Sequence, residues 1–361
     1  MSPAGDVWAR YAAFELFTDV SHLFGSDSVD RAQVLVERPQ GEVGELSEKT
    51  TIAWTQATWS PVSGCTRVSD GCLHCYIERT TPFRVEHRRF DGAGLNATTG
   101  VQFHPERLGI PLRWRKPKRI FVCSMADLFH QEVSDDRIAE IFAVMAANYC
   151  WDRPTHTFQV LTKRHARMRS LLSSEAFRAK VARIAAGMTD GAHADGVHDA
   201  IYYHYWPLPN VWLGVTAENQ SWFEIRTEAL RATPAAVRWV SLEPMLGRAD
   251  IDYLHGPGTA AGMDWIVVGG ESGPGARPMH PDWARSVRDQ CVAAGVPFVF
   301  KQWGEWTPET GHRYSDFELL DGDPGAFVMR VGTKRAGREL DGRIWEQYPE
   351  TADSLDTPGV V

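Results

Sequence analysis

Three of the six cysteines lie within eleven residues, at Cys65, Cys72 and Cys75. Their spacing is C-x6-C-x2-C, and Gly64 and Gly71 allow the backbone to fold around a small bound group. Thiolates select zinc or iron–sulfur centres. Three cysteines without an evident fourth suit a [4Fe–4S] cluster whose remaining iron takes a ligand from outside the protein. The pattern therefore predicts a metal centre held by these three thiols.

Zinc is the main alternative for the three thiols. His74, His104 or Cys123 could supply a fourth ligand and close a structural zinc site. His74, however, directly precedes a cysteine ligand and is badly placed to bind the same ion. Cys150 and Cys291 lie in helical stretches and are predicted to be core residues rather than ligands. Ligand chemistry alone leaves both kinds of centre open.

The composition indicates a globular protein of one large α/β domain or two ordinary ones, with 361 residues of which 43% are hydrophobic. The sequence has no apolar run near ~18 residues and its start does not resemble a signal peptide, so it predicts a cytoplasmic protein outside the membrane. A reducing compartment would keep the clustered thiols available for a metal. The net charge of −8 gives no overall attraction to nucleic acid but leaves room for a local basic patch.

Short β-branched or aromatic runs alternate with polar loops and helical stretches along most of the chain. The runs are residues 119–123, 157–161, 211–215, 237–241, 265–268 and 297–300, and a weaker strand before the cysteines makes about seven. Helices are predicted at 135–145 and at 282–291, the second ending at Gly295. Parallel neighbours need a crossover, so the predicted fold is α/β, a complete or partial parallel β/α (TIM-like) barrel.

The sequence divides into three predicted parts. These are an N-terminal helical extension at 1–49 with a helix near 7–17, the barrel at 50–312, and a C-terminal extension or tail at 313–361 that is expected to be disordered beyond about residue 350. An insertion at about 173–209 contains a predicted helix and the aromatic run 202–206. Aromatic residues of this kind favour a packed insertion over a lid.

Charged residues directly follow several of the predicted strands, where the chemistry of a β/α barrel lies. Asp127, Lys163, Glu243 and Lys301 are predicted catalytic residues on this ground. Because they adjoin apolar strands, opposite charges at these positions would need one another, a ligand, or both.

The loop Gly269-Gly270-Glu271-Ser272-Gly273-Pro274-Gly275 is the most ligand-like in the sequence. Glycines let backbone amides approach a carboxylate, phosphate or ribose, and Glu271 could take a hydroxyl pair or an ammonium. Glu218 and Asn219 follow another strand and are predicted to help hold the cofactor. A Rossmann cofactor is not predicted, since no G-x-G-x-x-G joins a first strand to its helix.

Several motifs carry a resemblance to known proteins. They are IAWTQATWSP at 52–61, FVCSMADLF at 121–129, LGVTAENQ at 213–220, GGESGPGARP at 269–278, FKQWGEW at 300–306 and LDGRIW at 340–345. Together they resemble an uncharacterised family of phage- and prophage-associated proteins, over about residues 50 to 350. The three-cysteine motif and the barrel-like order are in turn similar to the radical S-adenosylmethionine (SAM) superfamily. The usual motif there is C-x3-C-x2-C with an aromatic residue before the last cysteine, a place that His74 occupies here after a longer first gap.

The resemblance implies two cofactors, a [4Fe–4S] cluster on the three cysteines and SAM. It places His74 beside the cofactors, and the Gly-Gly-Glu stretch at Gly269, Gly270 and Glu271 resembles one that holds the methionyl amine in the superfamily. That stretch follows an early strand there and a late strand here, so the likeness is chemical rather than positional.

Two functions follow as expectations. The first is a radical SAM-like enzyme that generates a 5′-deoxyadenosyl radical with the help of an electron donor. The second is a zinc-stabilised protein that binds or processes nucleic acid without radical chemistry. Phage association favours a nucleic acid or nucleotide substrate, in DNA modification or repair. Its phosphates would lie on Lys163, Arg164 and Lys301, with Trp303 and Trp306 as aromatic faces.

Overall fold

The computed structural model describes residues 50, 52–150, 155–189, 193–252, 260–308, 317–319 and 327–350. The helix expected near 7–17 and the tail beyond residue 350 lie outside these ranges.

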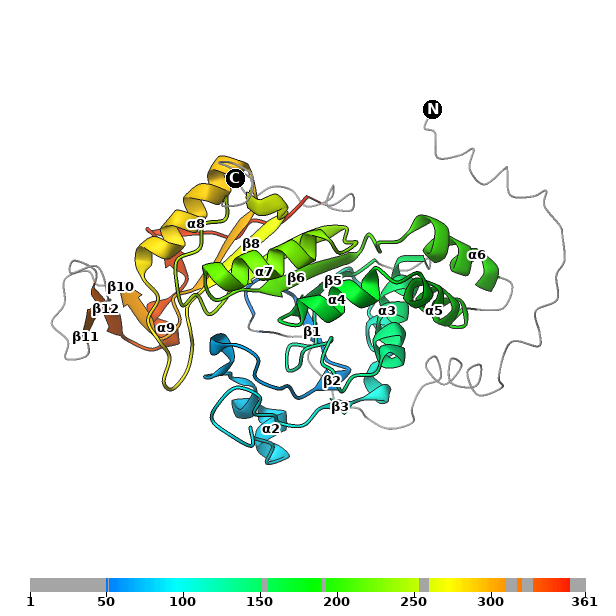
Figure 1. Ribbon diagram of the computed structural model, residues 1–361, viewed down its shortest axis with the longest axis horizontal. Coiled ribbons are helices and arrows are strands. Elements are labelled where there is room, and N and C mark those ends of the chain that lie inside the picture. The colour runs from blue at the N-terminus through cyan, green and yellow to red at the C-terminus, as the bar shows by residue number, and fades with distance from the viewer. Residues whose placement is uncertain are drawn as a thin grey trace.

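A parallel sheet of seven strands forms the centre of the molecule and curls into a half-barrel (Figure 1). In spatial order the strands are β1 (Ala57–Trp59), β4 (Arg119–Val122), β5 (Thr157–Thr162), β6 (Val211–Thr216), β7 (Val237–Leu242), β8 (Trp265–Gly269) and β9 (Phe298–Gln302). All neighbours pair in parallel. The predicted partial β/α barrel is confirmed, including the weak strand before the cysteines.

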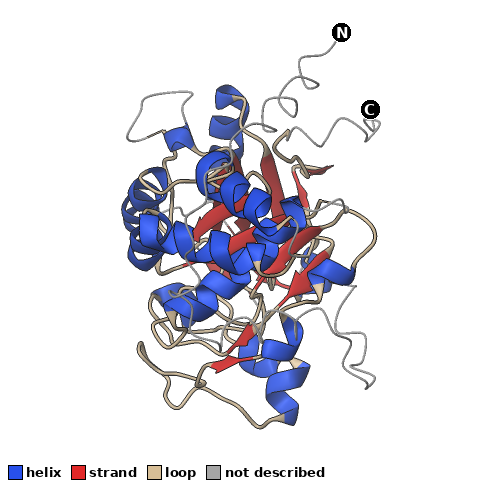
Figure 2. Cartoon of the chain, turned by 90° about the vertical axis from the view of Figure 1, so that its right-hand side faces the viewer, coloured by secondary structure: helices blue, strands red, loops and turns tan. Residues whose placement is uncertain are grey.

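Helices cover one face of this sheet (Figure 2). They are α3 (Asp135–Cys150), α4 (His165–Leu172), α7 (Gln220–Arg231) and α8 (Pro281–Ala294). The predicted stop of α8 is confirmed, since Gly295 takes a left-handed conformation with φ of 66°. Every residue of β6 is buried, as expected for a strand covered on both faces.

Tryptophans fill the other face of the sheet. Trp239 lies at the centre of this cluster, with its ring 5.1 Å from those of Trp54 and Trp265. Gly214 on the neighbouring strand leaves the space for it, because a Cβ there would lie 2.4 Å from the Trp239 ring. This part of the half-barrel is therefore packed core. A binding site in the half-barrel is then expected at the strand ends.

The insertion contains α5 (Glu175–Ala186), α6 (Ala194–Asp199) and a π-helical turn, η8 (Ala200–His204). It packs on α3, where Phe142, Phe177 and Trp206 have ring centroids 5.8 to 6.4 Å apart. The predicted packed insertion is thus observed, although Tyr203 is 68% exposed.

Smaller elements surround the half-barrel. Near the cysteines these are β2 (Val62–Ser63), η4 (Asp70–Cys72), η5 (Ile77–Arg79), α2 (Thr81–Val85), β3 (Gln102–Phe103), η6 (Pro105–Arg107) and η7 (Pro111–Arg113), and η9 (Ala260–Gly262) precedes β8. No helix in the described part of the chain is both long enough and apolar enough to cross a bilayer.

After β9 the chain forms the antiparallel strands β10 (Trp306–Pro308), β11 (Phe317–Leu319) and β12 (Phe327–Arg330), then α9 (Thr333–Ala336), β13 (Glu339–Leu340) and β14 (Arg343–Ile344). The backbone of 345–347 then returns along β9, where the Phe300 amide donates to the Trp345 carbonyl at 3.0 Å. This return protects the edge of the sheet. The predicted boundary at 312 falls between β10 and β12, which pair with each other, and the domain limits stay a prediction.

Candidate metal and cofactor site

The segment that carries the three cysteines lies across the carboxyl ends of the strands. Its start is tied to the loop after β4, where the Gly64 amide donates to the Met125 carbonyl at 3.0 Å. Its middle reaches the end of β6, where the Ser69 hydroxyl donates to Glu218 at 2.6 Å. It also reaches the loop after β8, where the Asp70 carbonyl accepts from Arg277 at 3.0 Å. The sheet therefore brings the motif to the edge where the charged residues were predicted.

The three thiols lie close together. The Cys75 amide donates to the Cys72 carbonyl at 3.2 Å, a tight turn in which side chains three residues apart lie on the same side. Burial raises the pKa of the Cys65 thiol and also that of the Cys75 thiol. The neighbouring Cys72 adds to the rise at both. All three are free thiols.

Positive side chains stand beside these thiols. Arg164 works against the rise in the pKa of Cys65, and Lys163 does the same at Cys75. Within the described ranges no group of three His, Cys, Asp or Glu side chains is arranged as a metal site, so the thiols would have to turn toward a common centre. The net effect is a raised pKa at Cys65 and Cys75, which favours the protonated thiols, and a thiolate-bound centre at these cysteines stays a prediction.

The three candidate fourth ligands for zinc, His74, His104 and Cys123, each lie in a different environment. His104 Nε2 is hydrogen-bonded to the Ser63 hydroxyl at 2.8 Å. Cys123 is buried, and burial raises the pKa of its thiol to about 12. The ring of His74 lies against the glycine-rich loop, where a Cβ on Gly275 would lie 2.8 Å from Nδ1.

Glu218 is the most deeply buried carboxylate of the site, with 0% of its surface exposed. It forms ion pairs with Lys163 and with Arg226, the second at 3.1 Å. Burial alone would raise the pKa of Glu218, but the two cations outweigh it and hold the pKa below its ordinary value. Gly71 gives the carboxylate room, because a Cβ there would lie 2.6 Å from Oε1. Two predicted site residues thus meet under the cysteine segment.

Glu243 and Lys301 form a second ion pair, with 2.6 Å between Oε1 and Nζ. Glu243 directly follows β7 and Lys301 lies in β9, so the pair bridges the intervening strand β8. Gly269 at the end of β8 makes the bridge possible, since a Cβ there would lie only 3.2 Å from the Glu243 carboxyl carbon. The pair places opposite charges at the strand ends in contact, one of the outcomes expected from the sequence.

Glu271 is paired with Arg277, a residue that the sequence did not single out. Arg277 Nη2 and Nε donate to the two carboxylate oxygens at 2.6 and 2.8 Å, which is bidentate pairing. The only sign of this pair in the sequence was the presence of two opposite charges, Glu271 and Arg277, in the same loop. Gly270 allows a close backbone approach, because a Cβ there would lie 2.0 Å from the Trp303 carbonyl oxygen.

Asp127 and Asn219 both have structural partners. Asp127 accepts from the Thr162 hydroxyl at 2.7 Å and from the Lys163 amide at 3.0 Å, which ties the loop after β4 to the end of β5. Asn219 caps α7 by accepting from the Trp222 amide at 3.1 Å. Roles for both in catalysis or cofactor binding stay predictions.

The expectation that Trp303 offers an open aromatic face is wrong. It is only 5% exposed, because its ring packs on Phe300 with centroids 4.8 Å apart. Its indole also donates to the Glu339 carbonyl at 2.8 Å. Trp306 is half-buried and donates to the Ala276 carbonyl at 2.7 Å.

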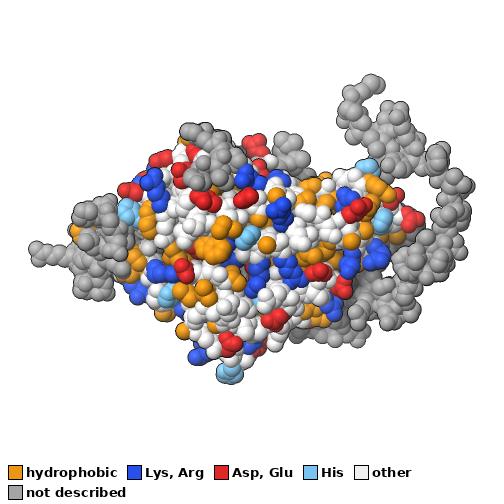
Figure 3. Space-filling view, viewed as in Figure 1, with side chains coloured by type: hydrophobic (Ala, Val, Ile, Leu, Met, Phe, Trp, Pro, Cys, Tyr) orange, Lys and Arg blue, Asp and Glu red, His pale blue; other side chains and the backbone are white. Residues whose placement is uncertain are grey.

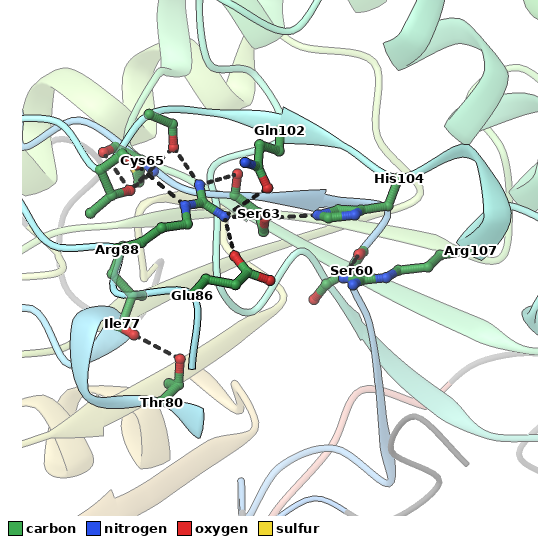
Figure 4. A network of polar contacts seen from close by, with 12 residues as sticks. Ser60, Ser63, Cys65, Ile77, Thr80, Glu86, Arg88, Gln102, His104 and Arg107 are labelled. Carbon is green, nitrogen blue, oxygen red and sulfur yellow. Dashed lines mark hydrogen bonds and ion pairs between the residues drawn. The ribbon is translucent and has the colours of Figure 1, made fainter. Parts of the chain in front are cut away.

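Arg88 holds together the backbone that leads into the cysteine motif (Figure 4). It donates to the Ser63 hydroxyl at 2.8 Å, to Gln102 at 3.1 Å and to the Gly100 carbonyl at 2.7 Å. The Cys65 amide is bound close by, donating to the Thr99 hydroxyl at 3.0 Å. Arg88 therefore links β2, β3 and the first cysteine.

We expect Arg88→Met to lower the free energy of unfolding by about 2–3 kcal/mol, because several carbonyl and side-chain acceptors lose a charged donor. Urea unfolding followed by circular dichroism measures this. Arg84→Met, at an exposed position of the adjacent α2, is the control and should change stability by less than about 0.5 kcal/mol. Equal stability of the two variants would contradict a structural role for Arg88.

The comparison with protein families matches residues 49–349 to a model described as a protein of unknown function, DUF5131. The chain belongs to the DUF5131 family. The matched range contains the cysteine segment and all seven strand ends, so the whole site lies within the DUF5131 domain. Membership of an uncharacterised family is thereby confirmed, while association with phage stays a prediction.

No curated protein matches the DUF5131 chain. Among solved structures, it is similar to a mutant of spore photoproduct lyase at a TM-score of 0.34 and 10% identity, covering 87% of this chain and 80% of that one. A structure titled as spore photoproduct lyase complexed with dinucleoside spore photoproduct matches at 0.32 and 10%, covering 83% and 81%. TM-scores this low do not establish a shared fold.

Proposed function

We propose that this DUF5131 protein is a radical SAM-like iron–sulfur enzyme whose [4Fe–4S] cluster is held by Cys65, Cys72 and Cys75. One observation carries the proposal: the segment that carries the three cysteines lies over the strand ends of a half-barrel, where its Ser69 bonds to Glu218 and its Asp70 carbonyl accepts from Arg277. Three thiolates leave one iron of such a cluster open to an exogenous ligand. A site of this kind at the carboxyl ends of parallel strands suits a cofactor enzyme.

The Glu271–Arg277 pair is the proposed site for the amino-acid end of SAM. A carboxylate and a guanidinium side by side match the ammonium and carboxylate that SAM carries on one carbon. Arg277 also donates to the Asp70 carbonyl, so the pair lies against the cysteine segment. When bound, the cluster and SAM would supply a 5′-deoxyadenosyl radical after reduction by an electron donor.

The other ion pairs hold the mouth of the half-barrel in place. Glu218 joins the cysteine segment to β6 through Ser69, and Lys163 adds positive charge beside Cys75. Glu243 and Lys301 bridge the end of β8 beside the glycine-rich loop. These residues would orient the cofactors and limit the entry of water, while the cofactors carry the chemistry.

The proposed substrate is a nucleic acid or nucleotide. Basic side chains at the strand ends support this class, since phosphates are bound by Arg and Lys. The alternative is a zinc-stabilised protein that binds or processes nucleic acid without radical chemistry, for which three cysteines are also suitable ligands.

Anaerobic purification followed by metal analysis separates the two functions. The proposal expects a brown protein with about four irons per chain. With dithionite and SAM, it should release 5′-deoxyadenosine and methionine, measured by chromatography. A colourless protein with one stoichiometric zinc and no cleavage of SAM would overturn the proposal and support the alternative.

A further inference from the structure

Arg164 differs from the other basic residues at the strand ends because it has no protein partner for two of its nitrogens. Lys163 is paired with Glu218, and Lys301 with Glu243. The Nε and Nη2 atoms of Arg164 are buried, yet neither makes a hydrogen bond within the part of the chain that the structure describes. Buried polar groups are nearly always paired, and an unpaired guanidinium is costly. The free nitrogens therefore call for a bound acceptor.

Arg164 lies at the site itself. It directly follows β5 and precedes α4. Its charge acts on the thiol of Cys65. Burial, with Arg164 and Arg167 nearby, lowers the pKa of His130 to about 4. The ring of His130 is bonded to the hydroxyl of Thr66, which follows the first cysteine. Figure 3 shows Lys and Arg side chains gathered near the middle of this face, close to where α4 begins.

The nearby carboxylates are already satisfied by other groups. Asp127 accepts from the Thr162 hydroxyl and from the amides of Lys163 and Phe129. Glu218 is shared by two cations. No ion pair joins Arg164 to either of these carboxylates, so its charge is available to an anion of the substrate.

We propose that Arg164 binds a phosphate of the nucleotide or nucleic acid substrate, its guanidinium turning out of the buried position so that Nε and Nη2 reach the phosphate. This edge of a guanidinium donates two parallel hydrogen bonds and fits two oxygens of one phosphate. The inference rests on the proposed function and selects one of three basic residues as the phosphate ligand.

The carboxylate of SAM is a less suitable occupant of this position. In the proposed function Arg277 binds the SAM carboxylate and Glu271 binds the SAM ammonium, and both residues lie in the loop after β8. β5 and β8 are three strands apart in the sheet, or roughly 14 Å at the usual spacing. Since the two charged groups of SAM share one carbon, a carboxylate held after β8 does not reach Arg164.

The test measures binding of fluorescein-labelled single-stranded DNA, about 16 nucleotides long, to the full-length protein by anisotropy over a series of salt concentrations. We expect Arg164→Gln to weaken binding about tenfold, because two charge-assisted hydrogen bonds are lost. The slope of log K against log salt should become shallower by about 0.7, the value of one phosphate contact on a single strand. The Arg164→Lys variant should keep the slope but bind the DNA several-fold more weakly, because lysine lacks the two parallel N–H donors of the guanidinium.

Arg169→Gln is the matched control, with the same charge change at an exposed position on α4. Its binding should stay within about twofold of the unchanged protein. Unaltered binding by Arg164→Gln, or equal weakening by both variants, would overturn the proposal. Loss of SAM binding by Arg164→Gln in equilibrium dialysis, with DNA binding intact, would also overturn it and assign Arg164 to the cofactor carboxylate.

The DNA assay is independent of the test of the proposed function. It measures DNA binding by the protein as purified, whereas the proposed function is tested by iron content and SAM cleavage. A zinc protein whose DNA binding still depends on Arg164 would keep the phosphate site while removing the radical chemistry. Urea midpoints of the variants show whether each remains folded. If Arg164→Gln unfolds, Arg164→Lys, which keeps the charge, still tests whether the phosphate needs the paired N–H donors of arginine.

Discussion

Each of the variants Cys65→Ala, Cys72→Ala and Cys75→Ala is expected to lose most of the iron bound per chain. The reason is that a cluster held by three thiolates loses a third of its protein ligands with any one of them. Iron is measured by a colorimetric assay after anaerobic reconstitution, together with the visible absorption of the cluster.

The controls are Cys150→Ala and Cys291→Ala. Both cysteines lie in helices away from the motif, Cys150 at the end of α3 and Cys291 on the buried side of α8. Cys291→Ala is expected to cost about 1 kcal/mol of stability through the lost packing, with its iron content unchanged. Equal loss of iron in both sets of variants would place the metal centre elsewhere.

Glu218→Gln is expected to reduce the free energy of unfolding by about 3–5 kcal/mol, because it leaves Lys163 and the buried Arg226 without their shared counter-charge. The loss should appear as a lower urea midpoint. It should also weaken the hold of β6 on the cysteine segment, since the hydrogen bond from Ser69 would go to a neutral amide.

Glu228→Gln removes the same charge from an exposed position of α7 and is the control, with an expected change below about 0.5 kcal/mol. The double variant Glu218→Gln with Lys163→Gln should recover part of the loss, since one unpaired cation is then removed. Equal stability of Glu218→Gln and Glu228→Gln would show that the buried pairs do not hold the strand ends together.

The sequence alone determined the seven strands, their parallel order and the helices between them. These features arise from local patterns: apolar runs of strand length, helix-length spacers and the glycine that ends α8. The spacing of the cysteines and the polar residues after each strand also predicted one site at the carboxyl ends, because parallel strands present those ends at one edge.

Only the tertiary structure decided which charges neutralise one another. Glu218 meets Ser69 across 149 residues, and Arg277 meets Asp70 across 207. No local pattern encodes contacts at such separations, because the curl of the sheet and the path of the cysteine segment create them. For the same reason the sequence treated Lys163, Arg164 and Lys301 alike and left Trp303 open to solvent. Packing paired the two lysines, buried the tryptophan and left the Nε and Nη2 of Arg164 without a protein acceptor in the described chain.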